Sequence, residues 1–139
     1  MSANAALKAS DLNIGDTYSE CLVEDLKRTQ IVQYAGASGD YNPLHTDEVF
    51  TTKVAGYPTV FAHGMLTMGM TGRMLTNYVG DGRLTKYGVR FTNQVWPGDT
   101  LTATATLESL EGNIARFQVE TKNQDGTTVL SGYAEARVD

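Results

Sequence analysis

The sequence is short of cysteine, proline and histidine, and these shortages exclude several classes of protein. Its 139 residues include one cysteine, three prolines and two histidines. A lone Cys21 cannot form an internal disulfide, and one cysteine with two histidines does not make a typical metal-ligand set. We therefore expect no metal site, and a reducing, cytoplasmic setting.

Positive charge and long apolar runs are also scarce. There are 11 Lys and Arg residues against 16 Asp and Glu, giving a formal net charge of -5. No basic cluster interrupts this balance, so we expect no nucleic acid or anionic membrane as partner. The apolar stretches are too short to span a membrane, and the first ten residues, MSANAALKAS, lack the apolar centre of a secretory signal. We expect a soluble protein.

The length and the 41% hydrophobic content allow one domain over residues 1–139. A strand is predicted over 15–23, a helix over 28–37, and an irregular segment after it with one short helix at 47–54. Residues 64–79 carry apolar side chains almost all round a helical wheel, with Arg73 as the only charge. This pattern predicts a buried helix, roughly 24 Å long.

Beyond residue 80 the hydrophobic period changes from that of a helix to that of a strand. Alternation at 89–91, 101–107 and 115–119 indicates half-buried strands, and four strands fit this part of the chain. Short turns at 96–99, 111–113 and 125–126 favour antiparallel neighbours. The expected fold is α+β, with an antiparallel sheet wrapped around a central buried helix.

A candidate acid-base pair lies in the segment DYNPLH at 40–45. Asp40 and His45 are separated by Pro43, which keeps the segment from being regular helix and lets the two side chains converge. An ionised Asp and a near-neutral His can share a water, which suits acid-base catalysis without a nucleophile. Asn42 has the residue type of an Asx turn, and we assign it a supporting role.

A second candidate element is the segment AHGM at 62–65. It stands where the buried helix begins, so the Gly64 amide can point an unpaired N–H into a cavity and stabilise a carbonyl oxygen that gains negative charge. His63 is interpreted as a hydrogen-bonding residue at the helix entry rather than a catalytic one. The pair and the amide together are the parts needed to hydrate an enoyl thioester.

These segments resemble the MaoC-like (R)-specific hydratases and dehydratases of the hot-dog fold. The matching residues are YAGASGDYNPLH at 34–45, AHGM at 62–65, VRF at 89–91 and WPGD at 96–99. The likeness is greatest to the B-type dehydratase subunits of mycobacteria, which share the HGMLTMG segment. The resemblance implies reversible hydration of trans-2-enoyl thioesters, on coenzyme A or acyl carrier protein, to (3R)-3-hydroxyacyl thioesters, without a cofactor.

The resemblance also implies site residues and a dimer. Asp40 and His45 would be catalytic and Gly64 would supply the oxyanion N–H, supported by Asn42, Pro43 and His63. Met65 and Thr71 would contact substrate, and active-site tunnels would lie at the interface of a homodimer or of a heterodimer with a related subunit. The chain departs from the family pattern at two positions. Many members have Ala or Ser at the position of Thr51, and some have Ser at the position of Gly72.

Other residues favour structural interpretations. The methionines of the helix suit core packing or the lining of an acyl tunnel. Lys86, Arg90 and Arg73 are single basic residues, typical of solvated surface. Cys21 lies in an expected strand without a histidine or basic cluster beside it, which favours a buried, inert thiol.

Two other functions remain open on the sequence: a hot-dog thioesterase, and a non-catalytic subunit that binds acyl chains or stabilises a heterodimeric dehydratase. The retained Asp40 and His45 argue against the second. The sequence leaves open the acyl-chain length, the carrier, the pathway and the physiological direction.

Overall fold

The computed structural model describes residues 6–139. Residues 1–5, half of the segment in which we expect no secretory signal, lie outside the described residues. The elements, in order, are η1 (Ala9–Asp11), β1 (Thr17–Val23), α1 (Arg28–Ser38), η2 (Phe50–Val54), α2 (Gly64–Val79), β2 (Leu84–Phe91), β3 (Leu101–Glu111), β4 (Ile114–Lys122) and β5 (Thr128–Arg137). Among residues 6–139, no helix has the length and apolar character needed to cross a membrane.

The strands form one antiparallel sheet in the order β1-β3-β4-β5-β2. The short turns after β3 and after β4 join neighbouring strands, as predicted. The turn at 96–99 does not, and our inference from its length was wrong, because β2 pairs with β5 while β3 pairs with β1 and β4. The connecting segment 92–100 can extend to about 30 Å, which is enough to pass two intervening strands at roughly 4.8 Å spacing.

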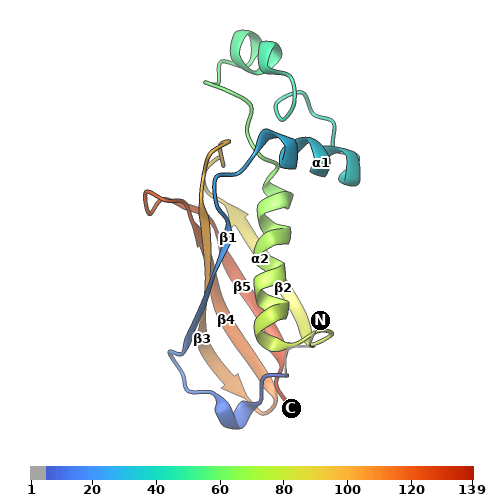
Figure 1. The fold of residues 1–139 in the computed structure, drawn as a ribbon. Helices are drawn as coiled ribbons and strands as arrows, with labels where there is room; N and C mark the ends of the chain where they lie inside the picture. The colour runs from blue at the N-terminus through green and yellow to red at the C-terminus, as the bar shows by residue number, and fades with distance from the viewer. Residues whose placement is uncertain (1–5) are drawn as a thin grey trace.

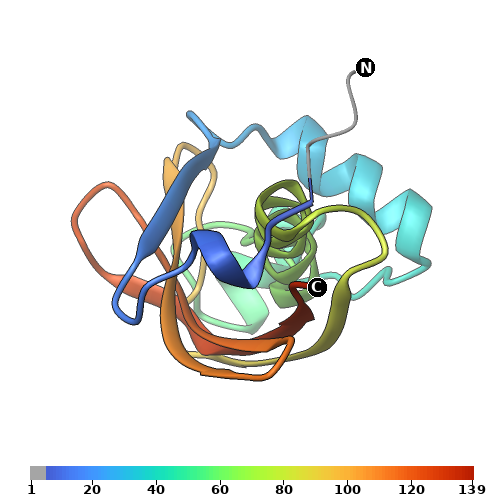
Figure 2. The same cartoon turned by 90° about the horizontal axis from the view of Figure 1, so that it is seen from below.

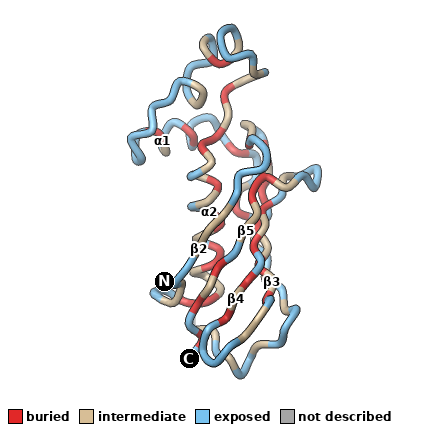
Figure 3. The backbone as a smooth tube through the Cα atoms, turned by 180° about the vertical axis from the view of Figure 1, so that it is seen from behind, coloured by how far each residue is buried: buried red, intermediate tan, exposed pale blue. Residues whose placement is uncertain are grey.

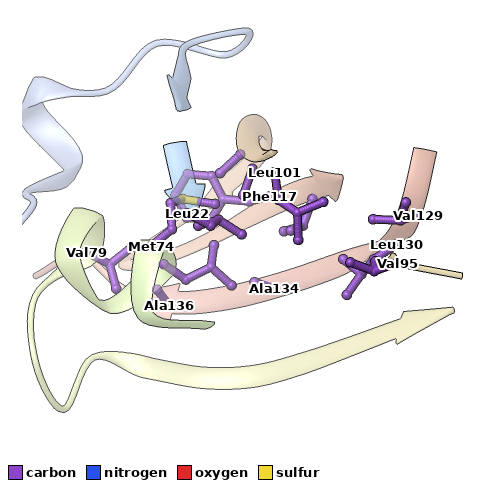
Figure 4. Close-up of a cluster of buried hydrophobic side chains, with 14 of the residues drawn as sticks. Leu22, Met74, Val79, Val95, Leu101, Phe117, Val129, Leu130, Ala134 and Ala136 are labelled. Carbon is purple, nitrogen blue, oxygen red and sulfur yellow. The ribbon is translucent and has the colours of Figure 1, made fainter. Parts of the chain in front are cut away.

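Helix α2 lies in the concavity of the sheet, which curls around it (Figures 1 and 2). Its residues Met74, Leu75 and Val79 are fully buried. They pack against the inner face of the sheet, where large Phe117 and Leu101 are interspersed with small residues such as Ala134 (Figure 4). Each large buried side chain contributes about 1.5–3 kcal/mol of apolar burial. The central helix and the sheet thus form one core.

The helix is not buried on every side in the single chain. Met65 is 56% exposed, and Met68 and Met70 are half-buried. Cys21 is exposed as well, so the prediction of a buried thiol was wrong. The physical reason is the two-residue period of edge strand β1, which turns Leu22 into the core and Cys21 outward.

The segment between α1 and α2 lies beyond one end of the sheet, next to the N-terminus of α2 (Figure 1). Much of it is exposed (Figure 3). It includes η2, a single turn of π-helix closed by the Ala55 N–H to Phe50 O hydrogen bond, in the region where a short helix was predicted. Both segments that carry the candidate residues meet at this end of the molecule.

Candidate active site

The loop that carries Asp40 is folded by its own side chains. Helix α1 ends at Gly39, whose φ of 75° is left-handed and costs glycine little, and the chain then reverses. The Asn42 N–H donates to Asp40 Oδ1 over 3.2 Å, and the Leu44 N–H donates to Asn42 Oδ1 over 3.0 Å. These consecutive Asx turns fix the loop locally, and Asn42 takes the supporting position that its residue type indicates.

His45 is held by a backbone carbonyl from the other side of the site. Its Nδ1 lies 2.7 Å from Phe61 O. A carbonyl oxygen can only accept, so Nδ1 carries the hydrogen and Nε2 carries the lone pair. The loop therefore presents His45 as the tautomer whose Nε2 can take a proton.

His63 makes the complementary contact. Its Nε2 lies 3.0 Å from Asp40 O, so Nε2 carries the hydrogen and donates it to the backbone of the loop that carries Asp40. The ring is 2% exposed, and Nδ1 has no hydrogen-bond partner among the described residues. His63 is the N-cap residue of α2, but its side chain makes no cap hydrogen bond there. His63 is thus a hydrogen-bonding residue at the helix entry, as interpreted from the sequence, and its hydrogen bond reaches the loop rather than the helix.

The two imidazoles are stacked on each other. Their centroids are 3.8 Å apart with an angle of 24° between the rings, and the Tyr34 ring meets His63 edge-on at 4.8 Å. One carboxylate oxygen of Asp40 and one ring nitrogen of each histidine lie within 4.8 Å of one another. The structure therefore brings Asp40 and His45 together, as predicted, and adds His63 to the pair.

The three groups lie close enough to one another to share a single water. A single water can bridge two acceptors up to about 5.5 Å apart, because each hydrogen bond spans roughly 2.8 Å. Each of Asp40, His45 and His63 also offers one ligand atom of a type that metal ions bind, so the structure groups three residues that the sequence analysis did not consider together as a ligand set.

The environment of His45 lowers its pKa below the ordinary histidine value. Burial is the largest cause, because it disfavours the charged imidazolium, and neighbouring His63 acts in the same direction. The hydrogen bond to Phe61 O and the charge of Asp40 oppose the shift. His45 is therefore a neutral base at neutral pH.

Gly64 begins α2, so its N–H has no acceptor within the helix. The preceding strand-like segment is fixed by the Ala62 N–H, which donates to Val95 O over 2.8 Å. A Cβ on Gly64 would lie 3.1 Å from three atoms of the Phe91 ring, which covers this position. The absence of a side chain thus keeps the amide approachable beside Phe91.

A cavity of about 270 Å³ opens at Gly64. It is lined by Phe61, Ala62, Gly64, Thr67, Phe91, Thr92, Asn93, Gln94, Val95 and Val129. Phe61 connects it to the acid-base pair, because the same residue lines the cavity and holds His45 through its carbonyl.

Thr67 was not predicted from the sequence, but it lies in the cavity wall with a buried hydroxyl. The residue is 2% exposed, and Oγ1 has no hydrogen-bond partner within residues 6–139. One turn further, Thr71 is fully buried, and its Oγ1 lies 2.7 Å from Thr121 Oγ1. Of these two threonines, only Thr67 lines the cavity.

We expect Thr67→Val to stabilise the protein by about 1 kcal/mol, because the change removes an unsatisfied buried hydroxyl and keeps the side-chain shape. The matched control is Thr71→Val, which leaves Thr121 without its partner and is expected to cost about 1–3 kcal/mol. Urea unfolding of the two variants measures both free energies. A destabilised Thr67→Val protein would contradict the assignment of an unpaired hydroxyl.

The other candidate residues have distinct surroundings. Met65 is exposed beside Gly64, outside the cavity wall. Gly72 is covered by Tyr87, whose Cε2 would lie 3.2 Å from a Cβ at that position, and whose hydroxyl donates to Met68 O over 2.7 Å. A serine at 72 would crowd this ring. Glycine at position 72 therefore leaves room for the Tyr87 ring of β2.

Pro43 and Thr51 tie η2 to the loop. The buried Thr51 hydroxyl donates to Asp47 O over 2.7 Å, and Pro43 O lies 3.1 Å away. The Thr51 side chain, which differs from the family pattern, therefore holds the segment that follows His45. Pro43 contributes both its ring and its carbonyl to the loop.

Comparison with known proteins bears on the whole chain. The family described as "MaoC like domain" matches residues 10–130. 3-Hydroxyacyl-thioester dehydratase Y of Mycobacterium tuberculosis is 40% identical over 104 residues, which are 73% of this chain and 33% of that protein. Peroxisomal enoyl-CoA hydratase 2 of Arabidopsis thaliana is 39% identical over 103 residues, 72% of this chain and 32% of that protein. The chain spans about a third of the length of these two relatives.

Solved structures are similar over almost the whole chain. R-hydratase PhaJ1 from Pseudomonas aeruginosa has a TM-score of 0.85 at 25% identity, covering 96% of this chain and 86% of that one. A Mycobacterium tuberculosis protein with a double hot-dog fold has a TM-score of 0.77 at 20% identity, covering 96% of this chain and 44% of that one. The predicted α+β hot-dog fold is thereby confirmed.

Proposed function

The chain belongs to the MaoC-like domain family, and from that premise we propose that it is a hydro-lyase that reversibly hydrates trans-2-enoyl thioesters to (3R)-3-hydroxyacyl thioesters. The carrier is coenzyme A or acyl carrier protein. The names of the similar dehydratase, enoyl-CoA hydratase and R-hydratase support this reaction class. The (3R) hand rests on the likeness to the R-hydratase.

One observation carries the proposal: a carboxylate oxygen of Asp40 and a ring nitrogen of His45 lie within 4.8 Å of each other, and Phe61, which holds His45, lines a cavity whose wall includes Gly64, the first residue of α2. Two acceptors at this spacing hold a water by its two hydrogens. The hydrogen bond to Phe61 O leaves Nε2 of His45 as the acceptor. The pair is thus arranged to take a proton from a water.

The proposed reaction moves one water across the conjugated double bond. The water oxygen bonds to the β carbon as His45 Nε2 accepts one of its protons, while the Asp40 carboxylate orients the other. The π electrons move onto the thioester oxygen, and the enolate then collapses as the imidazolium returns a proton to the α carbon. Dehydration follows the same steps in reverse.

The Gly64 amide stabilises the enolate. Its N–H stands at the positive end of a sixteen-residue helix, and Gly64 is part of the cavity wall, so we expect the N–H to bind the oxygen on which negative charge develops. Fixing this oxygen also fixes which face of the substrate meets the pair. The amide is therefore the proposed oxyanion donor.

The acidic limb of the pH–rate profile is expected below pH 6.5, because His45 must be neutral to accept a proton and its folded-state pKa lies below the ordinary value of about 6.5. Acidification through the lowered pKa protonates His45, and kcat/KM falls. Initial rates at constant ionic strength across pH 4.5–8 measure the limb. A midpoint above 6.5 would contradict the role of His45 as base.

The central experiment is a hydration assay with crotonyl to dodecenoyl thioesters on both carriers, followed by the loss of enoyl absorbance and by chiral analysis of the product. We expect loss of the conjugated absorbance, no release of free thiol, and a 3R product. Release of thiol would instead indicate a thioesterase. Acyl-thioester binding without turnover would indicate a non-catalytic subunit, and either outcome would overturn the proposal.

We also propose that the chain works as a homodimer or as a heterodimer with a related hot-dog subunit. In the described chain, β2 is an edge strand, and large apolar side chains near the site, Tyr41, Val49, Val54, Met65 and Phe91, are exposed. A partner subunit packed on this end of the molecule would cover them. Light scattering of the purified chain gives the mass, and a monomer under assay conditions that is fully active would contradict the dimer.

A further inference from the structure

His63 contacts both members of the catalytic pair through different parts of its ring. Its Nε2–H donates to the backbone carbonyl of Asp40, and its face stacks on His45 at 3.8 Å. Tyr34 of α1 supports the ring from another side. The contacts join α1, the catalytic loop and the first residue before α2, and they lie in a position that is 2% exposed.

The donor to the Asp40 carbonyl is attached to the helix that also supplies the Gly64 amide. His63 precedes Gly64 in the chain, so a hydrogen bond from its ring fixes the loop relative to the N-terminus of α2. The Asx turns order the loop internally, and the Phe61 carbonyl holds only its far end, at His45. The hydrogen bond from His63 to Asp40 O fixes the other end of the loop, at Asp40, relative to the Gly64 N–H.

We propose that His63 is a positioning residue that holds Asp40 by its backbone and His45 by its ring, and so sets both groups relative to the Gly64 amide. This inference rests on the proposed hydratase function. His63 acts through the pair and needs no contact with substrate. Its unpartnered Nδ1 makes no contact that holds the protein together, so its role resides in the Nε2 donor and the ring face.

Stacking also has an electrostatic consequence at His45. The titratable groups that face His45 are His63 and Asp40, with Tyr34 behind His63. His63 lowers the pKa of His45, so an uncharged side chain at position 63 that leaves His45 equally buried is expected to raise that pKa. The acidic limb of the rate profile then moves to higher pH, which is a change that a purely structural role of His63 does not produce.

Two variants separate the donor from the ring. His63→Gln keeps an amide N–H near the position of Nε2 and lacks the stacking face, whereas His63→Phe keeps the stacking face and lacks the donor. We expect His63→Phe to lower kcat about 10²-fold with KM changed little, because a small displacement of catalytic groups has that cost. His63→Gln is expected to restore about tenfold of the loss. In both, the acidic limb moves to higher pH.

An NMR titration reads the same effect without substrate. The sequence has two histidines, so in either His63 variant of the untagged chain the only histidine ring signals belong to His45. We expect the His45 midpoint to be higher than in the wild type. If the wild type fails to hydrate any enoyl thioester, the proposed function fails, yet this titration still tests the contact between the rings.

The proposal is overturned if both variants fold and keep kcat within twofold with an unmoved acidic limb. It is also overturned if activity falls only in proportion to the folded fraction, measured by circular dichroism at the assay temperature, while the His45 midpoint stays in place. Should His63→Phe fail to fold, His63→Gln alone decides: a shifted limb with lowered kcat supports positioning, and unchanged values refute it.

Discussion

Asp40→Asn and His45→Asn are each expected to lower kcat by about 10²–10⁴-fold while the protein stays folded. Asp40→Asn keeps an oxygen that can accept the Asn42 N–H, and His45→Asn keeps a donor near the position of Nδ1, which faces Phe61 O. Each change therefore removes the group proposed to orient the water or to accept its proton, and retains the hydrogen bond that the side chain makes to the backbone. Steady-state hydration kinetics and circular dichroism measure the two effects separately.

The double variant tests whether the pair acts on one water. Groups that act as a unit fail together, so Asp40→Asn with His45→Asn should cost little more than the worse single change. Asp47→Asn is the matched control, because it makes the same change seven residues later, where the side chain accepts the Phe50 N–H. We expect this control to keep activity within about twofold. Wild-type turnover in either single variant would remove the acid-base assignment.

Gly64→Val is expected to lower kcat by about 10²–10³-fold, the cost of losing one oxyanion donor. The N–H itself remains, but the added side chain stands where the thioester oxygen must approach. The first added carbon already lies 3.1 Å from the Phe91 ring. Because Phe91 is 50% exposed, its ring can turn away, so we expect the fold to persist. Hydration kinetics and thermal unfolding separate the effects.

Gly69→Val is the matched control on the same helix. A Cβ at Gly69 meets no atom of residues 6–139 within 4 Å and the residue is exposed, so we expect unchanged kinetics and a small gain in stability from helix propensity. The double variant Gly64→Val with Phe91→Ala shows whether the valine lowers kcat by blocking the approach to the Gly64 N–H or by displacing the Phe91 ring. Activity that returns in the double variant would assign the loss to Phe91, and a fully active Gly64→Val protein would refute the oxyanion role.

The central helix was predictable from the sequence to its ends. The apolar pattern at 64–79 coincides with α2, because a helix that packs into a sheet needs apolar side chains over most of its circumference. The strand order was not predictable from turn lengths, since β2 leaves the neighbourhood of β3 to pair with β5. A short turn brings two strands close in the chain, but which strands pair in the sheet depends on how the strands are arranged around α2.

The site was predictable where side chains carry the signal. Asp40, Asn42 and His45 take their places because an Asx-rich, proline-containing loop can fold in few ways. The carbonyls of Phe61 and Asp40, which orient the two imidazoles, are backbone atoms, and no residue type indicates them. Thr67 was missed for a similar reason, because a threonine inside an apolar helix gives no sign of whether its hydroxyl has a partner.

The anchoring of the catalytic loop through main-chain oxygens has a consequence for engineering and evolution. Asp40 is held from His63 by its carbonyl, and His45 is held by the carbonyl of Phe61, so neither anchoring acceptor depends on the identity of the residue that supplies it. New side chains at position 40 can therefore be sampled while the scaffold retains this anchor. In a library randomised there, we expect the members with an acceptor oxygen at position 40 to fold best, because they also keep the hydrogen bond from the Asn42 N–H.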